Sequence, residues 1–150
     1  MKLRKATPAD IPGIQALIRA NLDKLLPRTD DEIEELLPTF WVVEEEDGAI
    51  AGCCCLEVYS PKIAEIRSLA VDESCRGNGY GAMLVQVATE EAQRRRIQQV
   101  FAVTSSREYF ESLNFGPCLG EKFILFWNGT DTPAQPASNG RRRLYRRRRV

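Results

Sequence analysis

The chain has 150 residues, 43% of them hydrophobic, which is enough to bury one core and short for a second domain. It contains no histidine, which excludes Ser-His and Cys-His catalysis, His-ligated metals and the usual general base near neutral pH. The zero net charge divides into −6 over residues 1–130 (14 basic and 20 acidic groups) and +6 over residues 131–150 (seven basic groups and one acidic).

The N-terminal segment MKLRKATPAD lacks the apolar stretch of a signal peptide. No apolar run reaches the roughly 18 residues that a membrane-spanning helix needs. We therefore expect a cytoplasmic protein without membrane association.

One strand and two helices are predicted in the N-terminal part. Residues 3–5 form a short strand, after which Thr7 is the N-cap of a helix with Pro8 in its first turn. A second N-cap at Thr29 begins another helix, which Pro38 ends. The apolar residues of the first helix fall on one face, which can be buried.

Three strands are predicted next, at residues 40–46, 49–59 and 63–71. Asp47 and Gly48 join the first two through a tight hairpin turn, for which this pair is well suited. The remaining elements are a helix over about residues 79–95, a strand at 99–104, a short helix ending near Asn114 and a last strand at 121–127.

The order of these elements predicts the fold class. The early strands form a meander and the later ones alternate with helices. We therefore predict an α/β (α+β) fold with a mixed, mostly antiparallel central sheet of six to seven strands, flanked by helices.

The five cysteines include three consecutive residues, Cys53, Cys54 and Cys55. Neighbouring side chains of a strand point to opposite faces, so these three thiols cannot converge on one ion. We interpret them as reduced and buried, and we predict no metal site.

Residues 1–128 are predicted to form one domain, followed by a distinct tail at residues 129–150. The tail begins with Gly, Thr, Pro, Ser and Asn and ends in RRRLYRRRRV, which is typical of a flexible linker and a solvated basic segment. Contact with RNA or DNA is the alternative role, but the tail offers one aromatic residue, Tyr145, and no recognition motif.

Two opposite charges interrupt the strand at residues 63–71. Glu65 and Arg67 lie on one face of it together with Leu69 and Val71, since residues i and i+2 share a face. Either the two charges pair with each other or lie near an exposed end, or the sheet presents a carboxylate and a guanidinium to a cleft.

A glycine loop follows that strand directly. Gly77, Gly79 and Gly81 allow backbone N–H groups to turn toward one point at the start of a helix, which makes an anion site suited to a pyrophosphate. The loop lacks the Lys-Ser/Thr pair of an ATP-binding loop. It also follows the fourth strand, whereas the loop of a dinucleotide fold follows the first.

The string LAVDESCRGNGYGAMLV resembles the coenzyme-binding motif of the GNAT superfamily of N-acetyltransferases, in which Arg76, Gly79 and Gly81 match the pattern Arg/Gln-x-x-Gly-x-Gly/Ala. With LRKATPAD, LLPRT, AEIRSLAV and VFAVTSSREYFESLNF, the chain is similar to the short amino-acid N-acetyltransferases of the N-acetylglutamate-synthase-like branch over about residues 1–128. The resemblance implies the GNAT fold, acetyl-CoA as donor without a metal, and a role in amino-acid metabolism such as arginine biosynthesis.

The resemblance also implies how acetyl-CoA binds. The backbone of Leu69, Ala70 and Val71 would pair with pantetheine, while the strand from residue 99 would splay away and leave a slot for the thioester. The pyrophosphate would bind to the loop residues Arg76, Gly77, Asn78, Gly79, Tyr80, Gly81 and Ala82.

Direct attack on the thioester needs a neutral amine. Without histidine, Glu65 is our candidate base, acting directly or through a water, since burial disfavours the charged form of a carboxylate. Phe110 stands where the superfamily has its general-acid tyrosine and Tyr109 is expected to pack, so water would protonate the departing thiolate. An acyl-enzyme at Cys75 is disfavoured, because the chain has no histidine to activate the thiol.

An amino-acid acceptor carries a carboxylate, which arginine recognises through paired hydrogen bonds. Arg28 and Arg67 are our candidates for substrate binding, with Arg4 and Arg107 behind them. The most favoured acceptor is the α-amine of an amino acid such as glutamate.

Two alternatives and one question stay open. The acidic body could favour a cationic peptide, which would make the chain a protein or peptide N-acetyltransferase for N-termini or lysine. It could also be a non-catalytic acyl-CoA-binding module whose tail contacts nucleic acid. Whether the chain forms a homodimer is undecided.

Overall fold

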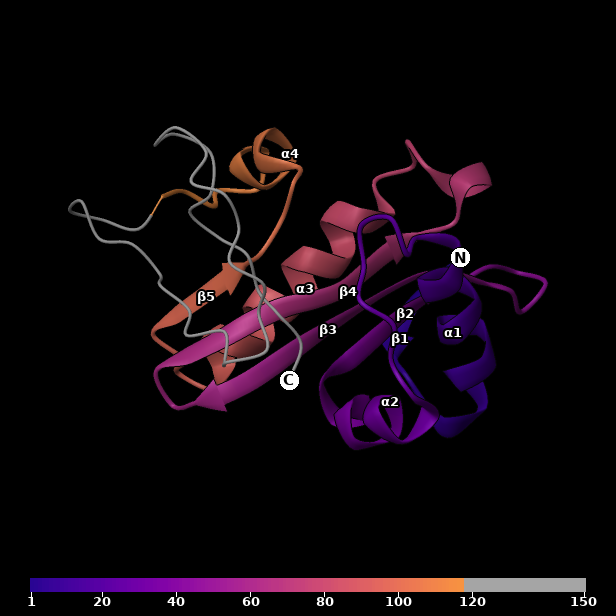
Figure 1. Cartoon of the computed structure of the whole chain (residues 1–150), viewed down its shortest axis with the longest axis horizontal. Helices are drawn as coiled ribbons and strands as arrows, with labels where there is room; N and C mark the ends of the chain where they lie inside the picture. The colour runs from indigo at the N-terminus through magenta and orange to yellow at the C-terminus, as the bar shows by residue number, and fades with distance from the viewer. Residues whose placement is uncertain (118–150) are drawn as a thin grey trace, which may run out of the picture. The chain divides into compact units, whose positions relative to one another are not determined.

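The structure, a computed structural model, describes residues 1–117 and forms two compact units, Met1–Ser105 and a second that begins at Ser106. The first unit contains a sheet and its flanking helices (Figure 1). The expected domain boundary after residue 128 and the basic tail lie outside the described residues.

The strands of the first unit are β1 (Lys2–Lys5), β2 (Phe40–Glu44), β3 (Ile50–Ser60), β4 (Ile63–Val71) and β5 (Gln99–Ala102). Its α-helices are α1 (Ile11–Ala20), α2 (Asp30–Leu36) and α3 (Tyr80–Arg94). Short 3-10 turns lie at η1 (Pro8–Asp10), η2 (Leu37–Thr39) and η3 (Glu73–Cys75). The predicted elements of this unit agree with these bounds to within a few residues.

The strands pair in the order β1-β2-β3-β4-β5. All neighbours are antiparallel except β4 and β5, which are parallel. The predicted mixed, mostly antiparallel sheet is therefore confirmed. Five strands lie in the described part instead of six or seven, and the strand expected at residues 121–127 falls outside it.

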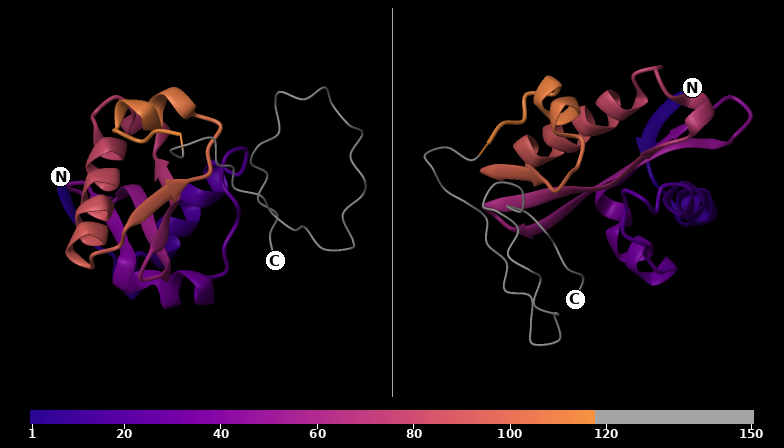
Figure 2. Two further views of the ribbon diagram at one scale, coloured as in Figure 1. Left: turned by 90° about the vertical axis from the view of Figure 1, so that its left-hand side faces the viewer. Right: turned by 45° about the horizontal axis from the view of Figure 1, so that its top comes forward.

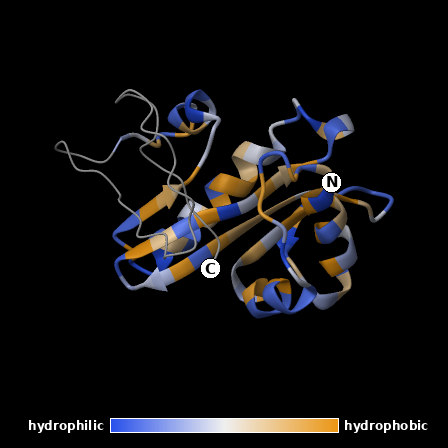
Figure 3. Ribbon diagram, in the orientation of Figure 1, coloured by the Kyte–Doolittle hydropathy of each residue, from blue (hydrophilic) through white to orange (hydrophobic). Residues whose placement is uncertain are grey.

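Helices cover both faces of the sheet, with α1 and α2 on one side and α3 on the other (Figure 2). The side of α1 and α2 contains a buried apolar cluster whose largest members are Ile14, Ile18, Ile33 and Phe40. Hydrophobic residues run along the central strands (Figure 3). This packing fixes which face of the sheet each side chain occupies.

The three consecutive cysteines lie in β3 and are fully buried, as predicted. Cys53 and Cys55 belong to the cluster beneath α1 and α2, whereas Cys54 pairs in register with Trp41. Burial raises the pKa of Cys53 and of Cys55 to about 12, so both thiols stay protonated. Within residues 1–117, no group of three or more Cys, Asp or Glu side chains is arranged to bind a metal ion.

The predicted cap at Thr29 and the predicted turn at Gly48 act as expected, whereas Thr7 precedes the 3-10 turn η1 and α1 begins only at Ile11. Thr29 accepts a hydrogen bond from the Glu32 N–H at 3.2 Å, and the Glu32 carboxylate accepts one from the Thr29 N–H at 2.7 Å. Gly48 takes a φ of +86° in the hairpin between β2 and β3, a conformation that glycine adopts freely. No helix within residues 1–117 is long and apolar enough to cross a membrane.

The second unit contains, within its described residues, the helix α4 (Arg107–Ser112). Phe110 packs edge to face against Tyr109 and Phe115, with ring centroids 5.6 and 5.3 Å away. Arg107 pairs with Glu111 one turn further along the helix, and its side chain is exposed. The Tyr109 ring meets that of Phe110 but Tyr109 is 38% exposed, so its expected packing is only partial.

Candidate active site

An extra residue in β4 shapes the centre of the sheet. Cys55 stands opposite Arg67, but Cys53 stands opposite Ala70, so β4 advances three residues where β3 advances two. Ser68 lies in this β-bulge with a φ of +52°, in the left-handed region. The bulge bends the strand at the position where the alternation of side chains changes.

The change in alternation corrects one expectation from the sequence. Regular alternation of side chains predicted that Leu69 and Val71 share the face of β4 that carries Arg67. That is wrong, because the bulge moves Ala70 onto this face, where it joins the apolar cluster beneath α1 and α2. The charged stretch of β4 therefore ends at Arg67.

One edge of β4 loses its neighbouring strand halfway along. β5 pairs with β4 only from Ile63 to Ile66, and β5 ends at Ala102. In the described part of the chain, residues 67–71 therefore have a strand partner on the β3 side alone. Backbone groups along such an edge can pair with an extended ligand, as the predicted slot requires.

The glycine loop runs from the end of β4 to the start of α3. Gly77 and Gly79 take φ values of +83° and +79°, which side chains rarely allow, and both face open space. α3 begins at Tyr80, and the N–H groups of its first turn have no acceptor within the helix. The helix dipole adds partial positive charge there, so the loop can bind an anion.

Side-chain contacts fix this loop on both sides. Arg76 Nη2 donates to Asn21 Oδ1 at the end of α1, at 3.2 Å, and the Asn78 amide donates to the carbonyl of Cys75 at 3.2 Å. The Tyr80 hydroxyl donates to Glu45 in the β2–β3 hairpin, and this bond raises the pKa of Tyr80 to about 12. The loop is thus anchored to α1 and to the hairpin.

Two arginines converge on one carboxylate beside β4. Glu57 on β3 accepts from Arg67 Nη1 and, at 3.3 Å, from Arg28 Nη2, both through Oε2. Arg28 Nε also donates to Ser68 Oγ at 2.8 Å, which joins the α1–α2 connection to the bulge. The side chains of Arg28 and Arg67 are only 6% and 16% exposed.

This cluster determines which groups carry charge. Burial disfavours ionisation of Glu57, but the bonds and charges of Arg67 and Arg28 outweigh burial and leave the pKa of Glu57 below its usual value. Burial likewise acts against the charge of Arg67, yet Glu57 leaves the pKa of Arg67 raised. Glu57 and Arg67 are therefore both ionised at neutral pH.

Glu65 lies next to this cluster on the same face of the sheet. It stands opposite Glu57 in the β3–β4 register, and only 3% of it is exposed. The Tyr59 hydroxyl donates to Glu65 Oε2, and the Tyr59 ring stacks on Phe101 of β5 at 6.2 Å. The candidate base is therefore buried, with a tyrosine at its carboxylate.

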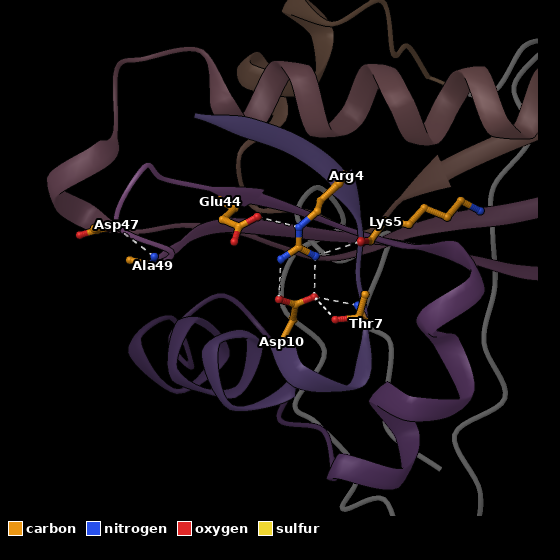
Figure 4. A network of polar contacts seen from close by, with 7 residues as sticks. All are labelled: Arg4, Lys5, Thr7, Asp10, Glu44, Asp47 and Ala49. Carbon is orange, nitrogen blue, oxygen red and sulfur yellow. Dashed lines mark hydrogen bonds and ion pairs between the residues drawn. The ribbon is translucent and has the colours of Figure 1, made fainter.

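Of the predicted arginines, the structure brings Arg28 and Arg67 together. Arg4 is placed elsewhere: its guanidinium donates to both oxygens of Asp10, at 2.7 and 2.8 Å, and to Glu44 at 2.8 Å (Figure 4). This network joins β1 to η1 and β2. Arg4 therefore has a structural role at the junction of these elements.

Three residues of the site were not predicted from the sequence: Glu57, Tyr59 and Ser68. Glu57 had a signal, because it is the one charged residue of β3 and stands opposite Glu65 once the hairpin register is fixed. Ser68 had none, since its contact with Arg28 joins residues 40 positions apart.

Comparisons with known proteins bear on what these elements do. Residues 14–115 match the acetyltransferase (GNAT) family. An amino-acid acetyltransferase of Mycobacterium tuberculosis is 33% identical over 116 residues, which cover 75% of this chain and 67% of that protein.

Two solved structures share the fold. Rv2747 from Mycobacterium tuberculosis, in complex with CoA and NLQ, has a TM-score of 0.75 at 31% identity, over 80% of this chain and 74% of that one. N-acetylglutamate synthase from Neisseria gonorrhoeae, complexed with coenzyme A and N-acetyl-glutamate, has a TM-score of 0.69 at 30% identity. That match covers 74% of this chain but only 27% of the synthase.

Proposed function

The chain belongs to the acetyltransferase (GNAT) family as an acyltransferase that uses acetyl-CoA, and we propose that its acceptor is the α-amine of an amino acid, with glutamate as the first candidate. The observation that carries this proposal is the pair of nearly buried arginines, Arg28 and Arg67, beside the buried carboxylate of Glu65. Such a pair suits an acceptor that brings its own carboxylate.

On the donor side, acetyl-CoA lies along the open edge of β4. The backbone of Leu69, Ala70 and Val71 pairs with pantetheine, and the glycine loop takes the pyrophosphate. The residues proposed for the pyrophosphate are Arg76, Gly77, Asn78, Gly79, Tyr80, Gly81 and Ala82. The glycine conformations at residues 77 and 79 and the unpaired N–H groups of the first turn of α3 support this placement.

On the acceptor side, the substrate carboxylate binds the guanidinium groups of Arg28 and Arg67. Binding there places the amine near Glu65, which lies one pleat from Arg67 on the same face of β4. A proton passes from the ammonium group to Glu65, directly or through a water, and leaves a neutral amine.

The chemical step is direct transfer. The amine nitrogen forms a bond to the acetyl carbonyl carbon, and backbone N–H groups stabilise the resulting oxyanion. The carbon–sulfur bond then breaks, the nitrogen gives its second proton to water as the amide forms, and the thiolate of CoA leaves. Since the usual tyrosine is replaced by Phe110, we propose that water protonates the thiolate, whose thiol has a pKa of about 8 to 9.

One assay tests the proposal. Acetyl-CoA is offered with a panel of free amino acids and of peptides with free N-termini or lysines, while thiol release and product mass are followed. Turnover of free amino acids supports the proposal, and turnover of peptides alone replaces it with the peptide acceptor. Binding of acetyl-CoA without any turnover would leave a binding module.

The basic tail is tested in the same assay. Deletion of residues 129–150 should leave amino-acid turnover near that of the full chain, because the proposed catalytic domain is residues 1–128. Loss of turnover in a folded truncated protein would instead assign the tail a part in the reaction.

A further inference from the structure

The arginine pair of the proposed acceptor site already binds a carboxylate that belongs to the chain. A single oxygen of Glu57, Oε2, accepts from Arg67 and from Arg28. The Glu57 side chain is 23% exposed, which is more than the side chains of Arg28 (6%) and Arg67 (16%). Glu57 thus occupies the hydrogen-bonding position that a substrate carboxylate would take.

The charges of the site are balanced as a result. Arg28 and Arg67 contribute two positive charges, and Glu57 and Glu65 contribute two carboxylates on facing positions of β3 and β4. An acceptor with one carboxylate and an ammonium group adds no net charge. An acceptor with a second carboxylate adds a negative charge to a site in which these four groups leave no excess positive charge to meet it.

We propose that Glu57 is a specificity-determining residue: as an internal carboxylate on the arginine pair, it disfavours acceptors with two carboxylates relative to isosteres with one. The inference rests on the proposed function, since it concerns how that acceptor site binds carboxylates, and it revises the first candidate: glutamate should be a poorer acceptor than glutamine. A monocarboxylate acceptor shares the arginine pair with Glu57 or displaces the Glu57 side chain toward solvent. A dicarboxylate does the same and also places its second charge beside the displaced Glu57.

The test is a comparison of matched acceptors in Glu57→Gln. The kcat/KM values for glutamate and glutamine, and for aspartate and asparagine, are measured in both proteins, because each pair differs by one charge at nearly constant shape. The ratio of dicarboxylate to monocarboxylate should rise about tenfold in Glu57→Gln, as expected for loss of one nearby charge. An unchanged or lower ratio overturns the proposal.

Glu44→Gln is the matched control. Glu44 also pairs with an arginine, is 28% exposed, and its loss changes the net charge of the chain equally. Glu44 is also far from Glu57 along the sheet. It stands opposite Ile50, which is seven residues from Glu57 on β3. Seven residues of a strand span roughly 23 Å. The acceptor ratio should not change in this variant, and an equal rise would mean that overall charge, not Glu57, sets the preference.

A binding measurement separates failure of this inference from failure of the proposed function. Glutarate, a dicarboxylate without an amine, is titrated calorimetrically into wild type and Glu57→Gln, and it should bind about tenfold more tightly to the variant. If the wild type acetylates none of the free amino acids of the panel, the proposed function fails, and the glutarate titration still decides the role of Glu57. Equal or weaker glutarate binding by a folded Glu57→Gln protein refutes that role.

Discussion

The hydroxyl of Tyr59 on β3 donates a hydrogen bond to the carboxylate of Glu65 on β4. The tyrosine ring stacks on Phe101 and is 44% exposed, whereas Glu65 is almost fully buried. Tyr59 therefore connects a buried carboxylate with the surface. This contact makes the two residues testable separately, one as the base and the other as its positioning residue.

Replacement of Glu65 by glutamine should lower kcat by a factor of about 100 or more, because the amide cannot take the proton of the amine. Binding of acetyl-CoA should change little, since the proposed coenzyme contacts come from the β4 backbone and the glycine loop. Steady-state kinetics and titration of acetyl-CoA measure the two effects. Full activity of Glu65→Gln across pH would remove Glu65 from the mechanism.

Replacement of Tyr59 by phenylalanine should have a smaller effect and a different signature. The variant keeps the ring that stacks on Phe101 but loses the hydrogen bond to the Glu65 carboxylate. We expect kcat to fall about tenfold and the acid limb of the kcat/KM profile to move to higher pH. A lower rate with an unmoved profile would mean that Tyr59 only packs.

Loss of either buried arginine should weaken the acceptor and not the donor. Arg28→Gln and Arg67→Gln each remove a charged donor for a carboxylate, which corresponds to a fall in kcat/KM for the amino acid of about 10- to 100-fold. The KM of acetyl-CoA should stay within about twofold. Arg94→Gln is the control, since Arg94 forms an exposed ion pair at the end of α3. An equal loss in all three variants would point to general destabilisation.

Gly79→Ala should impair binding of acetyl-CoA. An added Cβ meets open space, so the cost comes from the backbone φ of +79°, at about 1 to 2 kcal/mol or a shift of the loop. Gly48→Ala is the matched control, with a φ of +86° and the same open space in the β2–β3 hairpin. Both variants should lose similar stability in urea, and only Gly79→Ala should raise the KM of acetyl-CoA. A raised KM in both would show that destabilisation alone explains the effect.

The features predicted from the sequence are those that short-range patterns determine. Thr29 with Glu32, and Gly48 in its hairpin, act through neighbours within a few residues, so their roles follow from local chemistry. The glycine loop is local in the same sense, since its φ values and its helix start lie in one short segment.

The contacts within the site could not be predicted in the same way. The pairing of Arg67 with Glu57 depends on the β3–β4 register, and the bond from Arg28 to Ser68 joins distant segments at a bulge. A strict alternation of side chains gives no sign of a single inserted residue, so the predicted face of Leu69 and Val71 was wrong. The charges were identifiable from the sequence, whereas their partners required the fold.

The network around Arg4 gives a prediction about stability in acid. Hydrogen bonds from Arg4, together with those from the N–H and hydroxyl of Thr7, outweigh the effect of burial and lower the pKa of Asp10 from 3.8 to about 2. A carboxylate with a lowered pKa stabilises the fold fully above its unfolded pKa and loses that contribution as pH falls through the folded value. The contribution of Asp10 should therefore be present above pH 4 and vanish near pH 2.

Asp10→Asn should accordingly unfold more easily than wild type by on the order of 1 to 2 kcal/mol at pH 7, because it loses the ion pair but keeps the size of the side chain. Urea unfolding measured from pH 7 to pH 2 should show the difference between the two proteins shrinking between about pH 4 and pH 2. Glu111→Gln, which breaks the exposed pair with Arg107, should show little difference at any pH. A gap between wild type and Asp10→Asn that stays constant down to pH 2 would mean that packing of the side chain, not its charge, stabilises this junction of β1, η1 and β2.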